Sequence, residues 1–137
     1  MLNKNDSRTL GVYIARDPDH VYAFAAAPEN LPLWAPGLCS AVRRDGAEWI
    51  VQTPAGEMHL RFTGSNPFRV LDHWVSPEPG VEIHVPMRVL SHAMPAGTGS
   101  EVILTLLRQP GMSDASYAED IELVQQDLQR LKEVLER

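Results

Sequence analysis

The feature that most constrains this fold is the pattern of apolar side chains in the C-terminal residues 114–137. The spacing alternates between four and three residues, which places these side chains on one stripe of an α-helix. The stripe consists of Tyr117, Ile121, Val124, Leu128, Leu131 and Leu135. A coiled coil uses the same spacing, but this stripe spans only about three heptads. We therefore expect one long helix, with Asp114 as its N-cap, that packs against an apolar surface elsewhere in the chain.

The first part of the chain predicts one strand followed by two short helical segments. Residues 8–15 alternate between polar and apolar side chains, as a half-buried strand does. Asp17 and the proline after it start a helix, and Pro28 ends it. The stretch PENLPLWAPGL at 28–38 permits one more helical turn before its prolines prevent continuation. We expect Trp34, the largest side chain of this stretch, to anchor the crossing between helix and sheet.

Residues 40–107 predict a meander of antiparallel strands, because polar and apolar side chains alternate between short turn sequences. The turn sequences are PAGE, GSNPF, PEPG and the Pro- and Gly-rich MPAGTGS. The first two turns place Val51 opposite Leu60 and Leu60 opposite Asp72. The third turn places Asp72 opposite Val85. This register keeps the apolar side chains of all the strands on one face, as a correct register should.

The predicted inner face of this sheet is almost wholly apolar. Its members are Trp49, Val51, Met58, Leu60, Phe62, Val70, Trp74, Ile83, Val85, Met87, Val102, Leu104 and Leu106. Such a lining suits a hydrophobic ligand that is held by buried area and oriented by a few polar groups. The alternative is that these side chains fill the core and leave no cavity. Composition alone does not separate the two interpretations.

In the order of its elements and in one long motif, the chain resembles the START-like, or SRPBCC, superfamily. The motif is VYIARDPDHVYAFAAAPENLPLWAPGL, in which a strand is followed by an Asp-Pro step, a short helix and a proline-flanked tryptophan. Within the superfamily, the chain is most similar to the polyketide cyclase/dehydrase and lipid-transport type. These motifs are architectural, so they support the fold far better than the function.

The resemblance implies a single α+β domain over residues 1–137 with a helix-grip fold. In this fold a curved antiparallel sheet, here of about seven strands, wraps around the long C-terminal helix, and two short helices follow the first strand. The resemblance also implies a deep apolar cavity between sheet and helix, with Trp34 filling one end of it.

Two polar residues are candidates for chemistry in such a cavity. In the predicted register Asp72 points inward, where an unpaired carboxylate either has a raised pKa or finds a partner. It would then act as a general acid or base, or hold a hydroxyl or amine of the ligand. The alternative is a register slip of one residue, which puts Asp72 outside and His73 inside. Tyr117 would offer a hydroxyl at the mouth of the cavity, or else pack as a half-buried side chain.

The same register places three histidines side by side on the outer face of the sheet: His59, His73 and His84. Imidazoles at that spacing can bind a transition metal, but the only carboxylate near them is Glu82. A solvated or interface row of histidines is the simpler interpretation, and we assign no metal and no other cofactor. The outer face is also too apolar for a solvated sheet, which suggests a homodimer that buries part of it. Its apolar members are Ile50, Leu71, Val75, Leu90, Ile103 and Leu107.

Composition excludes several classes of partner and site. The net charge is -6 without a Lys/Arg cluster, so neither a nucleic acid nor an anionic membrane surface is an expected partner. The single cysteine, Cys39, rules out an internal disulfide framework and is expected to be a small buried hydrophobe. The first residues show no signal-peptide pattern, and no segment reaches the ~20 apolar residues of a membrane span. The resulting expectation is a cytoplasmic protein.

Three functions remain open, in order of preference. The first is binding of a small hydrophobic ligand of lipid or aromatic polyketide type. The second is an enzyme resembling the aromatases and cyclases, in which Asp72 and Tyr117 would steer dehydration or ring closure. The third is a protein-interaction module resembling the chaperone-activator relatives of this fold. The expected ligand-binding residues are Trp34, Trp49, Met58, Leu60, Phe62, Asp72, Trp74, Val85, Met87, Leu104, Tyr117, Ile121 and Val124.

Overall fold

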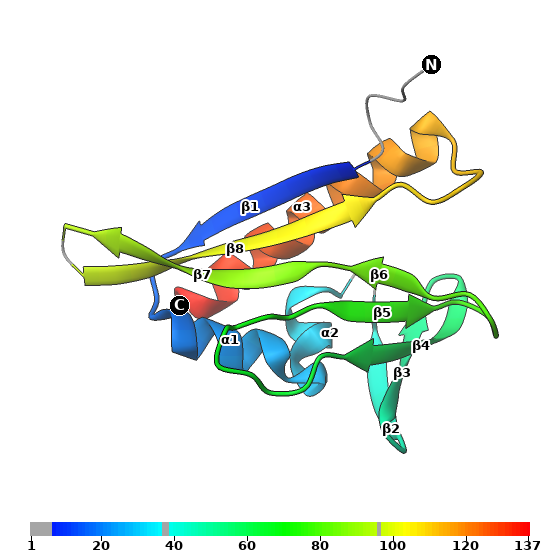
Figure 1. Cartoon of the computed structure of the whole chain (residues 1–137), viewed down its shortest axis with the longest axis horizontal. Coiled ribbons are helices and arrows are strands. Elements are labelled where there is room, and N and C mark those ends of the chain that lie inside the picture. Colours follow the sequence, from blue (N-terminus) through cyan, green and yellow to red (C-terminus); the bar gives the residue numbers. More distant parts are fainter. Residues whose placement is uncertain (1–6, 37–38, 96) are drawn as a thin grey trace.

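The computed structural model describes residues 7–36, 39–95 and 97–137 of the chain (Figure 1). The strands are β1 (Ser7–Ile14), β2 (Ala41–Asp45), β3 (Glu48–Thr53), β4 (Gly56–Phe62), β5 (His73–Ser76), β6 (Ile83–Val85), β7 (Met87–Met94) and β8 (Gly97–Leu107). The helices are α1 (Pro18–Ala26), the 3-10 helix η1 (Pro28–Asn30), α2 (Leu31–Trp34) and α3 (Asp114–Leu135). The start of the chain, where we expect no signal peptide, and the link between Pro36 and Cys39 lie outside the described residues.

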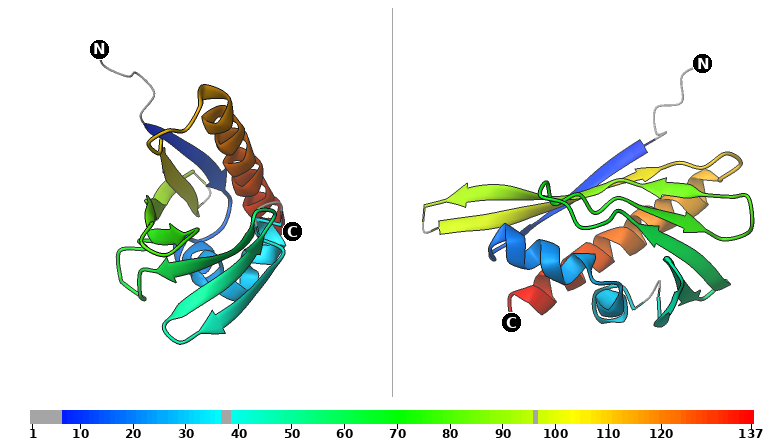
Figure 2. Two further views of the ribbon diagram at one scale, coloured as in Figure 1. Left: turned by 90° about the vertical axis from the view of Figure 1, so that its right-hand side faces the viewer. Right: turned by 60° about the horizontal axis from the view of Figure 1, so that its bottom comes forward.

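The strands form two antiparallel sheets that join into one curved surface. β1, β8 and β7 form a three-stranded sheet, and β2 to β6 form a five-stranded sheet in sequence order. The two sheets are linked by backbone hydrogen bonds, from the amide of Leu71 to the carbonyl oxygen of Met87 and from the amide of Val89 to that of Arg69. The strands curve around α3 and the short helices, as Figure 2 shows. This is the expected helix-grip arrangement, with eight strands in the described part of the chain.

α3 is the long C-terminal helix that the apolar stripe predicts, and it lies along the concave side of the strands (Figure 1). Its N-cap is Ser113, whose side chain accepts a hydrogen bond from the amide of Ser116 at 3.1 Å. The prediction of Asp114 as the cap is therefore wrong by one residue. The buried residues of α3 are Tyr117, Leu128, Leu131 and Leu135. All four belong to the predicted stripe.

The two short helices begin and end where their caps and prolines require. Asp17 caps α1, because its Oδ2 accepts from the amides of Asp19 and His20 at 3.0 and 3.3 Å. α1 ends at Ala26, just before the proline that cannot continue it. α2 is a single turn that ends at Trp34, and the side chain of this tryptophan is only 6% exposed.

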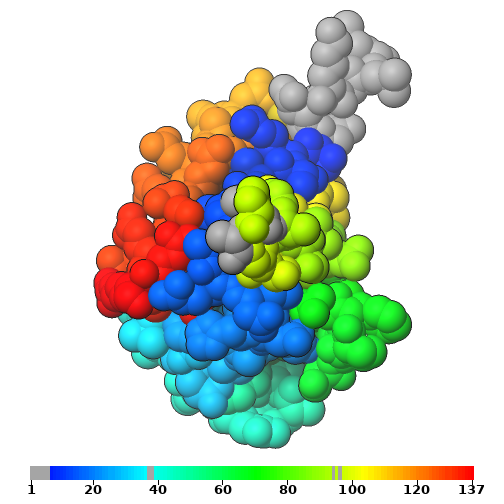
Figure 3. All heavy atoms as spheres, turned by 90° about the vertical axis from the view of Figure 1, so that its left-hand side faces the viewer, coloured from blue at the N-terminus to red at the C-terminus, as the bar shows by residue number. Residues whose placement is uncertain are grey.

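The driest part of the core lies between the three-stranded sheet, α1 and the C-terminal half of α3. Its fully buried apolar members are Ile14, Val21, Val89, Val102 and Leu131. Figure 3 shows this end of the molecule, where the atoms of α1 lie between the C-terminal end of α3 and the hairpin of β7 and β8. The one fully buried hydroxyl here, on Ser100, donates to the carbonyl oxygen of Arg16 at 2.8 Å and so keeps a partner.

The hairpin of β3 and β4 has a register that differs from the predicted one by two residues. Thr53 pairs with Gly56 across a tight turn, and Val51 therefore lies opposite Met58 instead of Leu60. A shorter turn than the predicted four-residue loop causes the difference. Because side chains alternate with a period of two, the shift leaves every side chain on its predicted face.

The register between β4 and β5 differs from the predicted one by three residues, and this shift does exchange the faces. Leu60 lies opposite Val75 and not opposite Asp72, while Phe62 lies opposite His73. Leu60 belongs to the buried core, so its neighbour Val75 also faces inward. The odd shift turns Asp72 and every second residue after it toward the outside.

The cause of this shift is the loop between β4 and β5, which takes up residues that the alternation pattern places in a strand. Asn66 organises the loop, because its Oδ1 accepts from the amides of Phe68 and Val70 at 3.1 and 3.0 Å. Its Nδ2 also donates to the carbonyl oxygens of Gly64 and Val70, each at 3.0 Å. β5 consequently starts only at His73.

The pairing of β5 with β6 differs from the predicted register by one residue. Trp74 lies opposite His84, and Val75 lies opposite Ile83. Ile83 thereby keeps its predicted inward position. Leu71 and Val75 were expected on the outer face, and both belong instead to the apolar core or pack against it.

Candidate ligand-binding site

The inner face of the five-stranded sheet is apolar, but most of its side chains are only partly buried. The buried ones are Val51 and Leu60, whereas Val42, Trp49, Met58, Phe62, Val75 and Val85 pack against the core and remain partly exposed. Neighbouring positions of the other elements add Met87, Leu104, Leu106, Ile121 and Val124. Solvent-accessible apolar surface therefore remains on a face that would be expected to form the interior.

The burial of apolar side chains also differs between the two halves of α3. Leu128 and Leu131, in its second half, are 2% and 0% exposed. In the first half, Tyr117 is 4% exposed, but Ile121 and Val124 after it are only partly buried, and Leu123 on the flank is 38% exposed. The first half of the helix and the inner face of the five-stranded sheet thus form the half-open part of the molecule.

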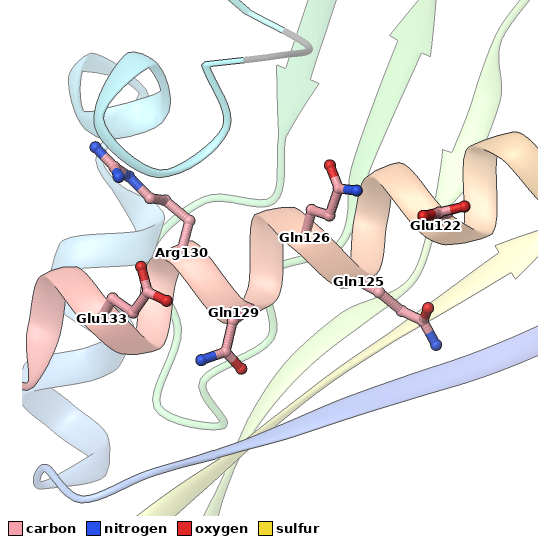
Figure 4. A pocket seen from close by; sticks show the side chains of 6 residues that line it. All are labelled: Glu122, Gln125, Gln126, Gln129, Arg130 and Glu133. Atoms are coloured by element: carbon pink, nitrogen blue, oxygen red, sulfur yellow. The ribbon is translucent and has the colours of Figure 1, made fainter.

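Asp127 is a partly buried carboxylate just inside the second half of α3, on the flank that packs toward α2. It shares a face with Val124 and Leu131, one turn before it and one turn after it. Arg130, the next residue along this flank, donates to the carbonyl oxygen of Leu33 in α2 at 3.3 Å and points toward that helix (Figure 4). Burial raises the pKa of Asp127 to about 7. The carboxyl group can therefore exchange a proton near neutral pH.

Asp120, two turns earlier on the same flank, also has a raised pKa, although the shift is smaller than that of Asp127. Burial, and then the negative charge of Glu119, raise the pKa of Asp120 above its usual value. The flank of α3 that faces the half-open region thus carries two acids whose charged forms are disfavoured.

His73 is the titratable group on the inner face of the sheet. Its ring lies 5.6 Å from the ring of Phe62, and its Nδ1 lies 3.0 Å from the carbonyl oxygen of Leu71. Burial lowers the pKa of His73, and the contact with Leu71 partly opposes this effect. The neutral imidazole keeps Nε2 for a ligand, since Nδ1–H donating to the carbonyl leaves Nε2 as an acceptor.

The structure places Asp72 outside the apolar region, so the prediction of an inward Asp72 is wrong. Its Oδ2 lies 2.9 Å from Nε2 of His84, and its Oδ1 accepts from the amide of Met87 at 3.0 Å. Both oxygens thus have protein partners, and the side chain fastens the end of β6 to the segment before β5. The register slip that was the alternative interpretation describes the observed faces.

Trp74 also lies on the outer face, which corrects its expected place in the pocket lining. Its ring is stacked on that of His84, with centroids 5.0 Å apart and planes inclined by 9°. On its other side the guanidinium carbon of Arg61 lies 4.3 Å from the ring centroid. These three residues are direct cross-strand neighbours, so a row of stacked planar groups crosses β4, β5 and β6.

The predicted row of three histidines does not form, because His73 faces inward. His59 and His84 remain outside, each beside an acid: His59 lies 3.2 Å from Glu48, and His84 contacts Asp72. Within residues 7–36, 39–95 and 97–137, no group of three His, Cys, Asp or Glu side chains is arranged to hold a metal ion.

Neither Tyr117 nor Trp34 offers a free polar atom to a ligand at the mouth of a cavity. Tyr117 is buried, and its hydroxyl donates to the carbonyl oxygen of Leu106 at 2.9 Å. The Trp34 side chain is part of the core cluster, and its buried Nε1 has no acceptor among the described residues. Of the remaining predicted ligand-binding residues, Trp49, Met58, Leu60, Phe62, Val85, Met87, Leu104, Ile121 and Val124 belong to the core or pack against it.

A shallow depression also runs along the exposed side of α3 (Figure 4). All of its lining residues come from this one helix: Glu122, Gln125, Gln126, Gln129, Arg130 and Glu133. A ligand there would touch a polar, solvated surface without an opposing wall, so this depression is not a candidate for apolar binding.

Two residues of the site were missed in the sequence because their surroundings are set by tertiary structure. Asp127 follows the stripe residue Val124 by one turn, and this spacing was the only available sign that its carboxylate lies at the edge of the buried face. His73 was treated as an outer residue because the loop held by Asn66 could not be recognised from alternation alone.

Comparisons with known proteins identify the fold. No protein-family model matches the sequence, and no curated protein matches it. The solved structure of XoxI from Bacillus cereus superimposes with a TM-score of 0.74 at 16% identity, covering 94% of each chain. A protein from Bacillus thuringiensis gives a TM-score of 0.73 at 15% identity, covering 94% of this chain and 98% of that one.

A START superfamily protein from Mycobacterium smegmatis gives a TM-score of 0.68 at 13% identity, covering 95% of this chain and 97% of the other. The similarity extends over nearly the full length of both chains. At these identities the likeness concerns the fold alone. No helix in the described part of the chain is long and apolar enough to cross a membrane. The chain has the START-like, helix-grip fold.

Proposed function

We propose that this protein binds a small, mostly apolar molecule between the inner face of β3 to β6 and the first half of α3. One observation carries the proposal: apolar side chains on this face stay partly exposed, while the equivalent side chains at the other end of α3 are dry. Apolar surface that is not covered by the chain itself costs free energy in water, and a ligand would recover it.

Three of the exposed apolar side chains would form the walls for such a ligand. Trp49 and Met58 lie on neighbouring strands β3 and β4, with Phe62 four residues further along β4 on the same face. Met58 is suited to ligands of irregular shape because its side chain is flexible and polarizable. Two polar groups would orient a hydroxyl, carbonyl or amine of the ligand: His73 on the inner face, and Asp127 at the edge of the region, one turn after Val124 in the second half of α3. We therefore propose a lipid or aromatic molecule that carries at least one hydrogen-bonding group.

The experiment is a titration with a neutral apolar fluorophore, N-phenyl-1-naphthylamine, followed by its emission. Met58→Gln preserves length but adds a polar amide to the proposed wall, and we expect it to weaken binding at least ~10-fold. The matched control is Leu107→Gln, which makes the same kind of change at an outer position that is 38% exposed. Equal loss in both variants, or no saturable binding to the parent protein, would contradict the proposal.

Enzymatic turnover is the second candidate function, and one feature favours it: burial raises the pKa of the Asp127 carboxyl group to about 7. A group of that pKa is suited to general acid and base catalysis at physiological pH. Since Asp72 and Tyr117 are engaged elsewhere, a cyclase-like or dehydratase-like reaction would use Asp127, with His73 as the second polar group. Turnover of a poly-β-keto substrate that is lost in Asp127→Asn, with binding retained, would support this function.

A further inference from the structure

A second hollow, of about 310 Å³, lies on the opposite flank of α3, toward β1. Its walls include Ser7 and Arg8 of β1, Arg108 after β8, and Asp114, Tyr117 and Ile121 of α3. Unlike the depression of Figure 4, it is enclosed by three separate segments of the chain. The hollow shares the side chain of Ile121 with the region of the proposed apolar site, but its charged walls, Arg8, Arg108 and Asp114, belong to the hollow alone.

Arg8 is directed toward the hollow by the alternation of β1. It lies two residues before Leu10, which is buried against the core, and it pairs with Leu106 of β8. Side chains two apart share a face of a strand, so the guanidinium of Arg8 extends on the side where α3 lies. No described residue forms an ion pair or a side-chain hydrogen bond with Arg8.

Arg108 is held in a fixed position, but only part of its guanidinium is used. Its side chain is 15% exposed, and its Nη2 donates to the carbonyl oxygen of Met112 at 2.9 Å and contacts Oδ1 of Asp114 at 2.6 Å. The guanidinium carbon also lies 5.6 Å from the ring centroid of Tyr117. The N–H groups at Nε and Nη1 have no acceptor among the described residues. Arg108 lines the hollow, so a ligand in the hollow can replace the water that these N–H groups bind.

The charges around this hollow do not cancel. Arg8 and Arg108 contribute two positive charges, and Asp114 contributes one negative charge on a side chain that is 93% exposed. The local excess of positive charge is unusual in a chain whose net charge is -6. The remaining N–H groups of a guanidinium match the geometry of a carboxylate or phosphate, which accepts two parallel hydrogen bonds.

We propose that this hollow binds an oxyanion, the carboxylate or phosphate group of a small molecule, between Arg8 and Arg108. Arg108 supplies preorganised donors, because its position is already fixed by Met112 and Asp114. Arg8 supplies a second, adaptable cation, and the hydroxyl of Ser7 lies at the same wall. Ile121 and the ring of Tyr117 add apolar surface for a short hydrocarbon body. This site does not rest on the proposed apolar site.

The test is a titration with sodium phosphate and with sodium acetate at constant ionic strength, followed by ¹⁵N NMR of the backbone and of the arginine Nε–H groups. We expect saturable shifts at Arg108 Nε–H and at the amides of Ala118 and Ile121. Arg8→Gln should weaken binding at least ~5-fold. The matched control is Arg88→Gln, which removes an equally exposed charge from β7 and should leave the affinity unchanged.

Two results would overturn the proposal. One is a set of shifts that spreads over all arginines and never saturates, and the other is equal affinity in the parent protein and in Arg8→Gln. Arg8→Gln is the decisive variant because Arg8 holds no other described residue, whereas Arg108→Gln would also release the loop before α3. Folding of each variant is checked by circular dichroism.

A third titration, with decanoate, identifies the source of the oxyanion. Binding at least ~10-fold tighter than that of acetate, with larger shifts at Arg108 Nε–H and a loss of affinity in Arg8→Gln, would assign the site to an apolar acid. Equal affinity would assign it to a small free anion, and both results support an oxyanion site. Failure of the apolar site would leave Arg108 responsive to acetate, so failure of either proposal is recognised separately.

Discussion

Toward its C-terminus the apolar stripe of α3 is fully buried and hydrogen bonds hold the helix to β1 and the residue after it, whereas further toward its N-terminus Ile121 and Val124 are only partly buried. At the C-terminal end, Lys132 donates to the carbonyl oxygen of Tyr13, and Glu136 accepts from the amide of Ala15, both at 2.8 Å. In the turn before Lys132, Leu128 and Leu131 are enclosed by the core. At the other end Ile121 and Val124 face side chains that remain partly exposed.

Because its two halves are buried to different degrees, one helix can contribute both to the stability of the fold and to ligand binding. Complete burial of apolar side chains supplies most of the free energy of folding, so the C-terminal half of α3 stabilises the fold. The half of α3 that is not fully buried costs the ligand-bound protein little free energy, because the ligand replaces the missing contacts. Stability and ligand affinity should therefore depend on different residues of the same stripe.

The largest expected loss of stability follows from a change in the C-terminal half of α3, where the apolar side chains are fully buried. Leu128→Ala removes a buried side chain and should lower the free energy of unfolding by about 2–5 kcal/mol, through lost transfer free energy and the resulting cavity. Ile121→Ala deletes the same number of carbon atoms in the half-open region and should cost only about 1–2 kcal/mol. Urea denaturation of both variants measures the comparison. Equal losses would mean that the two halves of α3 are docked alike.

A smaller effect is expected on the pH dependence of stability, through the partly buried carboxylate of Asp127. The pKa of Asp127 is about 7 in the folded chain, well above that of an unfolded aspartate, so folding disfavours its charged form. The unfolded state therefore binds fewer protons between these two pKa values, and stability falls as the pH rises from about 4 to about 7. Above pH 7 the full cost is present.

Asp127→Asn removes this cost. After allowance for solvent screening of a partly exposed group, we expect the variant to be more stable than the parent by about 1–2 kcal/mol at pH 8 and nearly equal to it at pH 4. Urea denaturation across this pH range measures the effect. Asp45→Asn changes an exposed aspartate in β2 and should not alter the pH dependence. An unchanged slope in Asp127→Asn would show that this carboxylate is hydrated in the folded state.

The smallest loss of stability is expected from a change on the outer face of the five-stranded sheet. Arg61→Gln removes the cation from the ring of Trp74 and also the contact of Arg61 with Glu82 at 3.1 Å. Exposed cation–π contacts and surface ion pairs each contribute at most about 1 kcal/mol, so the loss should stay below that of Ile121→Ala. Apolar-probe affinity should not change. A loss of affinity in Arg61→Gln would mean that the binding surface includes the outer face.

Most of the fold was predictable from the sequence, because its signals are local. The stripe of α3, the cap at Asp17 and the prolines around Trp34 act within a few residues of the structure they determine. The site was only partly predictable, since its faces depend on how many residues each loop consumes. A register error of two residues between β3 and β4 left every side chain on its predicted face. A register error of three residues between β4 and β5 put His73 and Val75 on the inner face in place of Asp72 and Trp74.

The central claim, that the half-open end of α3 covers an apolar ligand, is tested most directly by native mass spectrometry of freshly purified protein. Organic extraction and identification of any released compound follow, and then titration of the emptied protein with a panel of lipids and aromatic molecules. We predict a bound or bindable apolar molecule whose affinity falls in Met58→Gln and not in Leu107→Gln. A protein that stays free of ligand against the whole panel would contradict the claim and favour a protein-interaction module.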